Sequence, residues 1–404
     1  MIFLKNCRLI PELSGGLDYE RACVEIRNGK ITAISGADTG ATADESCRTE
    51  IDCRGMTLMP GIIDLHVHLS TAGCGVVRAY TNDQELVRDA CKSAQKFAEH
   101  GVTTMRDMGS TNAVAVTVRD MIRDGSLAGP RIFTSGHIIV PAGLVPMDKN
   151  TAYHSISGAE EMKRAVREEV GESVADVVKI YASGSAYKPG GEPDRAILTR
   201  GEITAAVDMA GFLGKKVAAH CHSAVAIKNC IEAGVYTIEH ASYIDLESIE
   251  AVAAKPERCY LVPTMAVYSY VPGSNPDEEF DRWSFEMRSA LGRKIAPHIR
   301  EAYEAGLELG FGTDTADGNY LTNGVGAEFR LRKELCGMRN IDILRQATST
   351  SAKILGIENE TGQVRVGFAA DLILVRGEPD RDISAMYEKP VLTICSGRVA
   401  AVNI

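Results

Sequence analysis

His66 and His68 form an HxH pair, an arrangement that could hold a metal ion. The residues before them, 62–66 (IIDLH), are mostly apolar and typical of a buried strand. In a strand the side chains at positions i and i+2 point to the same face, so the two imidazoles would converge on one point. Alone the pair is weak, because a surface pair or a packed pair has the same spacing. The context MPGIIDLHVH favours the metal-site interpretation.

Four more residues with ligand or proton-transfer chemistry fall at the ends of strand-like runs: Lys179 in DVVKIY, His220 in KVAAH, His240 in VYTIEH and Asp314 in LGFGTD. Each alone has an ordinary alternative. The lysine could reach water along its aliphatic chain, the histidines could be hydrogen-bonded core residues, and the aspartate could cap a helix. Their shared position at strand ends argues against coincidence. We therefore predict one site built from all six side chains.

The elements that must position these residues lie between residues 58 and 361, where strand-like runs alternate with amphipathic segments. The predicted strands are 62–66, 102–106, 131–135, 176–181, 216–220, 235–240, 259–264 and 309–314, and the predicted helices include 84–99, 158–170, 201–213, 223–233 and 294–308. Eight such units predict an α/β fold, a (β/α)8 TIM barrel, whose active site lies at the carboxyl ends of the strands. A doubly wound open sheet is the alternative, but its phosphate-binding glycine signature is absent from the sequence.

Both ends of the chain are rich in short β-type runs separated by turn residues. The runs are 2–8, 22–27 and 30–35 at one end and 371–376, 391–395 and 398–402 at the other. Chain termini often lie close together. We therefore expect residues 1–57 and 362–404 to form a small β-sandwich domain beside a barrel of residues 58–361.

The sequence resembles the amidohydrolase superfamily, and within it the branch of Xaa-Pro dipeptidases (prolidase-like enzymes) and imidazolonepropionases. The resemblance covers nearly the whole chain and is carried by PGIIDLHVH, VKIYASG, VAAHCH, AGVYTIEHA, LVPT, GTDT and the later GQVRVGFAADLILVRGEP. It implies a binuclear metal site in which all six residues are ligands. The HxH pair and Asp314 would bind the more buried ion, and His220 and His240 the outer one. Lys179, N-carboxylated by carbon dioxide, would bridge the two.

The implied chemistry is metal-dependent hydrolysis. Two divalent ions that share a water lower its pKa and yield a metal-bridging hydroxide, which attacks an amide carbonyl. Asp314 takes the proton and passes it to the leaving amine. The ammonium form of Lys179 would be disfavoured beside two cations, and carboxylation would convert it to an oxygen ligand. Zinc suits imidazole and carboxylate ligands best, although manganese, iron and cobalt accept them too.

His137, His222 and Tyr181 are the candidate substrate contacts, each with a plain structural role as its alternative. His222 lies two residues after His220, so strand alternation would aim both inward. Tyr181 ends the fourth strand-like run, and His137 follows the third. We also expect residues 267–286 to form a loop that covers the site.

The resemblance weakens after the third strand. Many prolidase-like relatives carry a GGH turn there, and its histidine is usually associated with the substrate carboxylate. In this chain Gly143 is followed by Leu144 and Val145. This departure puts a carboxypeptidase-type specificity in doubt, and His137 is the candidate to replace the missing histidine.

The leading prediction is an amidohydrolase that cleaves a C–N amide bond in a small molecule: a dipeptide, an Xaa-Pro-like compound or an N-acyl amino acid. A cyclic amidase of the imidazolonepropionase type is the alternative, but that relative lacks the bridging lysine. Deaminases of the superfamily also tend to lack it and carry a helix glutamate that is missing near His220. A non-enzymatic barrel scaffold typically loses several ligands, whereas this chain keeps all six.

Composition sets broader limits. The formal net charge of −10 argues against nucleic acid and anionic membranes as partners. The apolar N-terminal stretch is broken by Lys5 and Arg8, so we expect no signal peptide, and no apolar run reaches the length of a membrane span. The 11 scattered cysteines are typical of reduced, buried thiols. These features predict a cytoplasmic enzyme with a small-molecule substrate, and the resemblance adds the expectation of a homo-oligomer.

Overall fold

The fold is described from a computed structural model of the full chain. The described residues are 1–36, 49–70, 82–143, 153–172, 174–184, 192–254, 259–269, 278–316 and 324–403. Of the segment Gly143-Leu144-Val145, which stands where relatives carry the GGH turn, only Gly143 lies within the described residues. Within them, no helix is long and apolar enough to cross a membrane.

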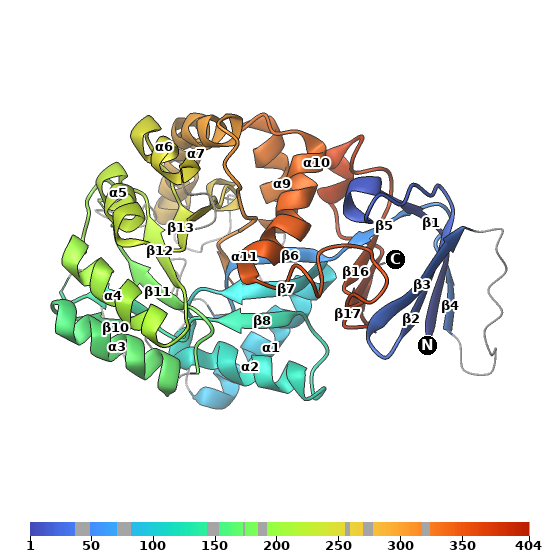
Figure 1. The fold of residues 1–404 in the computed structure, drawn as a ribbon, viewed down its shortest axis with the longest axis horizontal. Coiled ribbons are helices and arrows are strands. Elements are labelled where there is room, and N and C mark those ends of the chain that lie inside the picture. Colours follow the sequence, from blue (N-terminus) through green and yellow to red (C-terminus); the bar gives the residue numbers. More distant parts are fainter. Residues whose placement is uncertain are drawn as a thin grey trace.

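The two ends of the chain contribute strands to the same sheet, and both termini lie beside it (Figure 1). β5 joins the two contributions, because it pairs in parallel with β1 and antiparallel with β16. The sheet order is β18-β17-β16-β5-β1-β2-β3, with β4 paired to β1. Its strands are β1 (Ile2–Leu9), β2 (Ala22–Arg27), β3 (Lys30–Gly36), β4 (Thr49–Asp52), β5 (Thr57–Pro60), β16 (Leu372–Val375), β17 (Leu392–Cys395) and β18 (Arg398–Val402).

Two tight hairpins in this sheet follow from their turn residues. Asn28 and Gly29 link β2 to β3, and Ser396 and Gly397 link β17 to β18. All four residues have positive φ, between 47° and 79°. Two-residue turns of this handedness match the twist of the flanking strands, and Asn-Gly is their commonest sequence.

The middle of the chain forms two parallel sheets, which confirms the α/β class. One has the order β15-β6-β7-β8 and the other β10-β9-β11-β12-β13-β14. Both faces of most of these strands are buried, which explains their many apolar residues; β8 and β10 are partly exposed. The strands are β6 (Ile62–His68), β7 (Val102–Asp107), β8 (Arg131–Thr134), β9 (Ile138–Pro141), β10 (Tyr153–Ile156), β11 (Val178–Tyr181), β12 (Val217–Cys221), β13 (Thr237–His240), β14 (Tyr260–Val262) and β15 (Thr315–Ala316).

The prediction of a regular strand over 309–314 was wrong. Only Leu309 forms a bridge, to Leu261, and the short β15 follows at Thr315–Ala316. The glycines explain this irregularity. A Cβ on Gly310 would lie 2.6 Å from Leu65 Cδ1, and one on Gly312 would lie 2.8 Å from a methyl carbon of Val262. The segment is thus pressed against its neighbours more closely than a strand with side chains allows.

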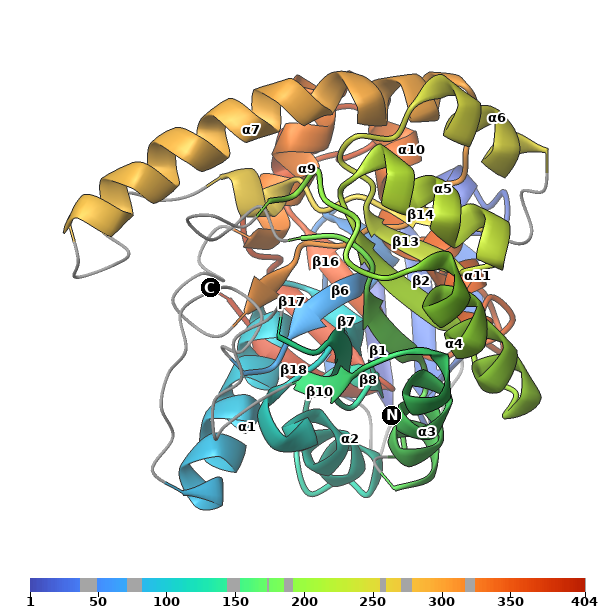
Figure 2. The same cartoon turned by 90° about the vertical axis from the view of Figure 1, so that its left-hand side faces the viewer.

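Helices lie outside the parallel strands (Figure 2). Four of them, α1, α4, α5 and α6, begin at side chains that accept hydrogen bonds from the first-turn amides, and Thr199 and Glu202 form a full capping box at α4. The helices are α1 (Asp83–Glu99), α2 (Val114–Arg123), α3 (Ala159–Gly171), α4 (Arg200–Phe212), α5 (Ala224–Ala233), α6 (Leu246–Ala253), α7 (Glu278–Glu304), α9 (Gly324–Glu334), α10 (Asn340–Arg345) and α11 (Ser351–Leu355). A π-helical turn, Gln346–Thr350, joins the last two.

The long helix α7 corrects the expected loop at 267–286, since residues 278–286 are helical. The predicted helix 294–308 is the second half of α7 together with a short turn after it. The buried positions 288, 292, 295, 299 and 302 recur every three or four residues, so the apolar stripe starts upstream of residue 294. At Gly292 the stripe fits closely against Tyr268, whose Cβ would lie 2.8 Å from an added methyl.

Candidate active site

The first group of the site comes from the carboxyl end of β6 and the irregular segment beside it. His66 and His68, two residues apart on the strand, both face Asp314. The Asp314 Oδ1 atom lies 3.5 Å from His66 Nε2 and 3.3 Å from His68 Nε2. The backbone fixes this arrangement, because the Asp314 amide donates to the His66 carbonyl at 2.7 Å. The three donors lie within 4.8 Å of one another and are buried.

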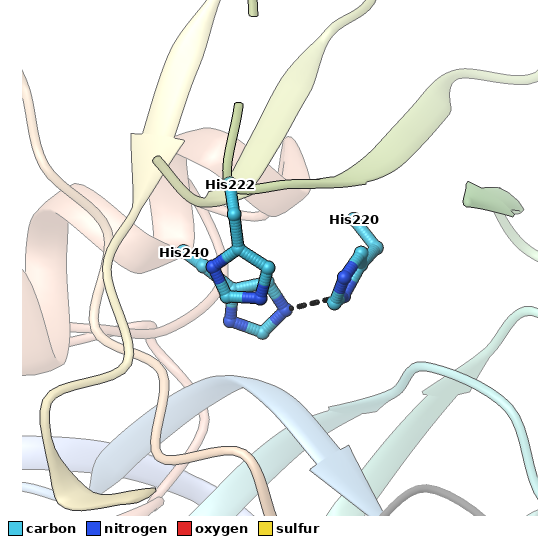
Figure 3. Close-up of side chains that lie close together, drawn as sticks. All are labelled: His220, His222 and His240. Carbon is cyan, nitrogen blue, oxygen red and sulfur yellow. Dashed lines mark hydrogen bonds between the residues drawn. The ribbon is translucent and has the colours of Figure 1, made fainter. Parts of the chain in front are cut away.

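The second group comes from the ends of β12 and β13. His220 Nδ1 and His240 Nε2 lie 3.0 Å apart, and Figure 3 shows the two rings turned toward each other. The His222 ring stacks on that of His240, with centroids 4.8 Å apart and 14° between planes. The two groups adjoin, since the centroids of His66 and His240 are also 4.8 Å apart. The structure thus brings together the histidines that the sequence pattern selected.

Lys179 belongs to the same site and is almost fully buried in β11. Among the described residues its Nζ has no hydrogen-bond partner. Burial lowers the pKa of this amine to about 8, although the carboxylates of Glu239 and Asp314 oppose the shift. A buried amine without a partner is costly unless something else occupies the site with it. The donor set around it, imidazoles and a carboxylate, is one that zinc and similar divalent ions bind. The residues present therefore fit metal ions.

Hydrogen bonds to the far side of each ring decide which nitrogen faces the centre. His66 Nδ1 contacts Glu239 Oε2 at 2.7 Å, and His68 Nδ1 contacts the Gly109 carbonyl at 2.6 Å. Both rings therefore direct Nε2 inward. His240 Nδ1 contacts Thr264 Oγ1 at 2.7 Å, which also leaves Nε2 inward. Such outer contacts fix the tautomer and the orientation of ligating histidines.

His220 is turned the other way. Its Nε2 contacts the Gly184 carbonyl at 3.2 Å, so Nδ1 faces His240. The imidazolium form is disfavoured at this position: burial lowers the pKa of His220 well below its usual value, with His222 and Lys179 adding to the effect. Burial likewise lowers the pKa of His66 to about 4. Neutral rings are the forms that can donate a lone pair to a cation.

Glu239 is a site residue that the sequence reasoning missed. It is fully buried and accepts hydrogen bonds from Arg106 Nη2 at 2.8 Å and from Thr237 Oγ1 at 2.6 Å, besides its contact with His66. Burial raises the pKa of this carboxyl, but Arg106 and His66 outweigh burial and bring the pKa down to about 2. Strand alternation places Thr237 and Glu239 on one face and His240 on the other, so the pattern around His240 gave no signal for Glu239.

Glu239→Gln is expected to weaken metal binding by about 10- to 100-fold, because the neutral amide orients His66 less well and raises its basicity less. Metal affinity measured by competition with a chromogenic chelator would check this. Glu328→Gln is the matched control, since Glu328 is another buried carboxylate, held by Arg332 at 2.6 Å on α9. Equal metal affinities for the two variants would contradict an orienting role for Glu239.

Asp64 is a second residue that the sequence reasoning missed, and its hydrogen bonds hold the first group in place. Its carboxylate accepts from the Thr313 hydroxyl at 2.7 Å and from the backbone amides of Thr313 and His66. Burial raises the pKa of Asp64 to about 7 despite these bonds. Asp64 thereby ties β6 to the segment that carries Asp314. Asp64, His66 and His68 are spaced by two residues on β6, so strand alternation could have predicted that Asp64 faces the same side as the histidine pair.

Two residues of the site have left-handed backbone conformations: His240 with φ 68° and Asp314 with φ 53°. Residues other than glycine seldom adopt such values, which cost about 1–3 kcal/mol and tend to cluster at functional sites. At His240 this conformation ends the strand. Neighbouring residues of a strand normally face opposite sides. The left-handed backbone at His240 lets its ring face His220 while Glu239, the preceding residue, also faces the site.

The predicted substrate contacts have different surroundings. Tyr181 stacks on the His220 ring, with centroids 4.3 Å apart. His222 Nδ1 contacts Ser242 Oγ at 2.7 Å, and that hydroxyl lies 3.3 Å from the Tyr268 hydroxyl. Both residues therefore adjoin the pair formed by His220 and His240.

His137 is held on the side of helix α3. Its Nδ1 lies 3.2 Å from the Glu169 carboxylate, which also accepts from the His137 amide and from His154. Burial raises the pKa of Glu169, but the bonds to His137 and His154 outweigh it and lower that pKa to about 2. The recorded contacts of His137 thus join it to Glu169 and His154, and not to the six predicted ligands.

Comparison with known proteins identifies the class to which this fold and site belong. The profile of the Amidohydrolase family matches residues 57–400, and the chain therefore belongs to the amidohydrolase family. As predicted, it is a hydrolase that acts on carbon–nitrogen bonds, in a family that uses divalent metals.

The individual relatives share less than a third of their residues with this chain. The chain is 28% identical to ochratoxinase from Aspergillus niger over 396 residues, which cover 90% of this chain and 79% of that protein. It is similar to a prolidase solved in complex with N-methylphosphonate-L-proline, with a TM-score of 0.85, 26% identity and full coverage of both chains. A Xaa-Pro dipeptidase with methionine bound in its active site has a TM-score of 0.83 and 29% identity, over 98% of this chain and 99% of that one.

Proposed function

We propose that this chain is a binuclear zinc amidohydrolase that cleaves the C–N amide bond of a small molecule: a dipeptide, an Xaa-Pro-like compound or an N-acyl amino acid. One observation carries the proposal. Lys179 presents a buried amine without a hydrogen-bond partner among the described residues, beside a cluster of inward-facing imidazoles and Asp314. A mononuclear site would leave that amine unused.

In this proposal His66, His68 and Asp314 hold one ion and His220 and His240 the other. When bound, the ions lower the pKa of a water molecule and polarise the substrate carbonyl. Lys179 joins the two groups after carboxylation. The neutral amine adds through Nζ to the carbon of carbon dioxide, and the nitrogen releases one proton, which leaves an N-carboxylate. The lowered pKa of Lys179 supports this step, because only the neutral amine can add.

Asp314 moves the proton. Its carboxylate is the one acidic group in the first donor set, and it faces both histidines of the HxH pair. We assign it as the general base that takes a proton from the attacking water and as the general acid that returns it to the leaving nitrogen. The backbone bond to the His66 carbonyl keeps Asp314 in position during both transfers.

The substrate class rests on the surroundings of the site and on the relatives. The similarity to a prolidase and to a Xaa-Pro dipeptidase supports a dipeptide substrate, and the similarity to ochratoxinase leaves room for other amides. Tyr181 and His222 adjoin the histidine pair and are our proposed substrate contacts. We retain His137 as a third contact, which would require a substrate carboxyl that reaches the Glu169 cluster.

We also propose that the parallel strands close into a (β/α)8 barrel of residues 58–361. Two sets of backbone hydrogen bonds support closure. The Asp176 amide donates to Thr134 at the end of β8, and residues 310 and 311 bond to both β14 and β6. The remaining segments, 1–57 and 362–404, would form the β-sandwich domain. β1 supports this, because it pairs with β4 before Asn6 and with β5 after it, while β2 pairs with it on both sides of Asn6.

Substrate screening of the zinc-loaded chain tests the function. We expect hydrolysis of Xaa-Pro dipeptides, other dipeptides or N-acyl amino acids, detected as free amino acid by liquid chromatography and mass spectrometry. Removing metal with a chelator should abolish turnover, and added zinc should restore it. Turnover that persists in the metal-free chain, or that is confined to cyclic amides, would overturn the proposal and favour the alternatives.

Other predictions remain open to measurement. Lys179 argues against a mononuclear cyclic amidase, and the complete set of six ligands argues against a barrel scaffold. The cytoplasmic location, the absence of nucleic-acid and membrane partners, and the homo-oligomer stay predictions from the sequence and the resemblance.

A further inference from the structure

A cavity lies away from the candidate active site, between helix α2, strand β8 and the C-terminal hairpin β17–β18. Its volume is about 560 Å³, which is within the range of small-molecule sites. Figure 1 shows α2 and β8 next to the C-terminal strands. Arg131, which lines the cavity, is the first residue of β8. The cavity therefore opens at the amino end of this strand, whereas the candidate active site gathers at the carboxyl ends.

Four arginines line this cavity: Arg119, Arg123, Arg131 and Arg398. The chain as a whole carries a net charge of −10, so such a concentration of cations is unusual for its surface. The one carboxylate in the lining, Asp176, is already engaged. It accepts from Arg119 Nη1 and from the Thr134 amide, both at 3.0 Å.

Two of the arginines are available to a ligand. Arg398 is exposed and takes part in no ion pair with any residue that the structure describes. Its guanidinium lies over the turn that follows α2, where a Cβ on Gly125 would be 2.9 Å from Arg398 Nη1. Arg123, on the neighbouring helix end, is 73% exposed at its side chain, and its one ion pair among the described residues is with Asp120. Both can turn donors toward the cavity.

Most of the remaining lining residues are apolar, with Ser396 as the polar one among them. The apolar ones include Ile122 and Leu127 from α2 and the turn after it, Ile132 and Phe133 from β8, and Ala400 from β18. Arginine guanidinium matches a carboxylate through two parallel hydrogen bonds. An apolar floor beneath such donors favours an anion with a hydrophobic body over an inorganic ion, which would leave that surface facing water.

We propose that this cavity binds a small organic carboxylate with an apolar body, with Arg398 and Arg123 as its anchors. The ligand would contact both the parallel-sheet region and the C-terminal hairpin. Because it binds only the folded chain, it would stabilise the contact between these two parts. The proposal does not rest on the activity proposed above.

Titration of the full chain with 4-fluorobenzoate, followed through its fluorine NMR signal, tests this site. We expect saturable binding that weakens at least about tenfold in the Arg123→Gln/Arg398→Gln variant, which loses both anchors. The Arg88→Gln/Arg195→Gln variant removes the same charge from exposed positions elsewhere and should bind normally. Ala400→Phe fills the cavity and should also abolish binding. Inorganic phosphate should bind at least about tenfold more weakly than the benzoate.

A crystal soaked in 4-bromobenzoate locates the ligand independently. An anomalous bromine peak between Ile122 and Ala400 would support the proposal. Four results would overturn it: a peak found only beside the histidine cluster, no saturation up to about 10 mM, equal affinity in both double-arginine variants, or phosphate binding as tight as that of the benzoate.

Discussion

Asp314→Asn is expected to lower kcat/KM by at least about a thousandfold, because the amide cannot carry the proton from the attacking water to the leaving nitrogen. Asparagine keeps the volume and one oxygen of the aspartate, so the fold and most of the metal should be retained. Steady-state kinetics on the best substrate from the screen would measure the loss, with metal content determined on the same preparations.

Asp245→Asn is the matched control for this substitution. Asp245 caps α6 by accepting from the Ser248 amide at 2.8 Å, and asparagine caps helices equally well. Its activity should therefore equal that of the native chain. If the Asp314→Asn variant kept a normal metal content and more than about a tenth of native activity, Asp314 would not be the proton carrier.

Lys179→Met is expected to reduce bound metal from about two equivalents to about one or fewer and to abolish most turnover, since the variant cannot form the bridging carboxylate that we propose. Methionine fills a similar volume in a buried strand, so the fold should survive. Metal analysis by mass spectrometry measures the first effect. Incorporation of ¹³C-labelled bicarbonate, seen as a carbamate NMR signal in the native chain and missing in the variant, measures the modification directly.

Lys216→Ala provides the control, because Lys216 lies just before β12 and its amine sits over the Tyr236 ring. It should keep both ions and the carbamate signal. Two metal equivalents in Lys179→Met would remove the bridge from the proposal. One equivalent of metal in both the native chain and the variant would indicate a mononuclear site and would favour the cyclic amidase as the function.

The ligand candidates could be predicted because strand periodicity is a strong local signal. His66 and His68 share a face by alternation alone, and β12 and β13 end at or next to His220 and His240. Parallel strands then bring those ends together. Short β-type runs separated by turn residues at both ends of the chain also predicted that these ends pair, and strands from both ends lie in one sheet.

What escaped prediction depends on tertiary contacts. The backbone of His240 leaves the strand with positive φ, so alternation gave no reason to place Glu239 in the same interior. The apolar residues of 309–314 give it the appearance of a strand, but Gly310 and Gly312 let it press against Leu65 and Val262, and this close approach makes it irregular. The direction of the His137 ring depends on Glu169, a partner 32 residues away along the chain. No local pattern specifies such a pairing.

The position of β5 in the end sheet has a consequence for biosynthesis. One edge of β5 pairs with β1, but the other pairs with β16, which begins at Leu372. At about 5–20 residues per second, a ribosome needs roughly 15–60 s to reach that partner after finishing β5. During this time the nascent chain carries an open strand edge, the kind of surface on which chains pair with one another. Molecular chaperones that mask exposed strands should therefore raise the yield of this enzyme most when translation is slow.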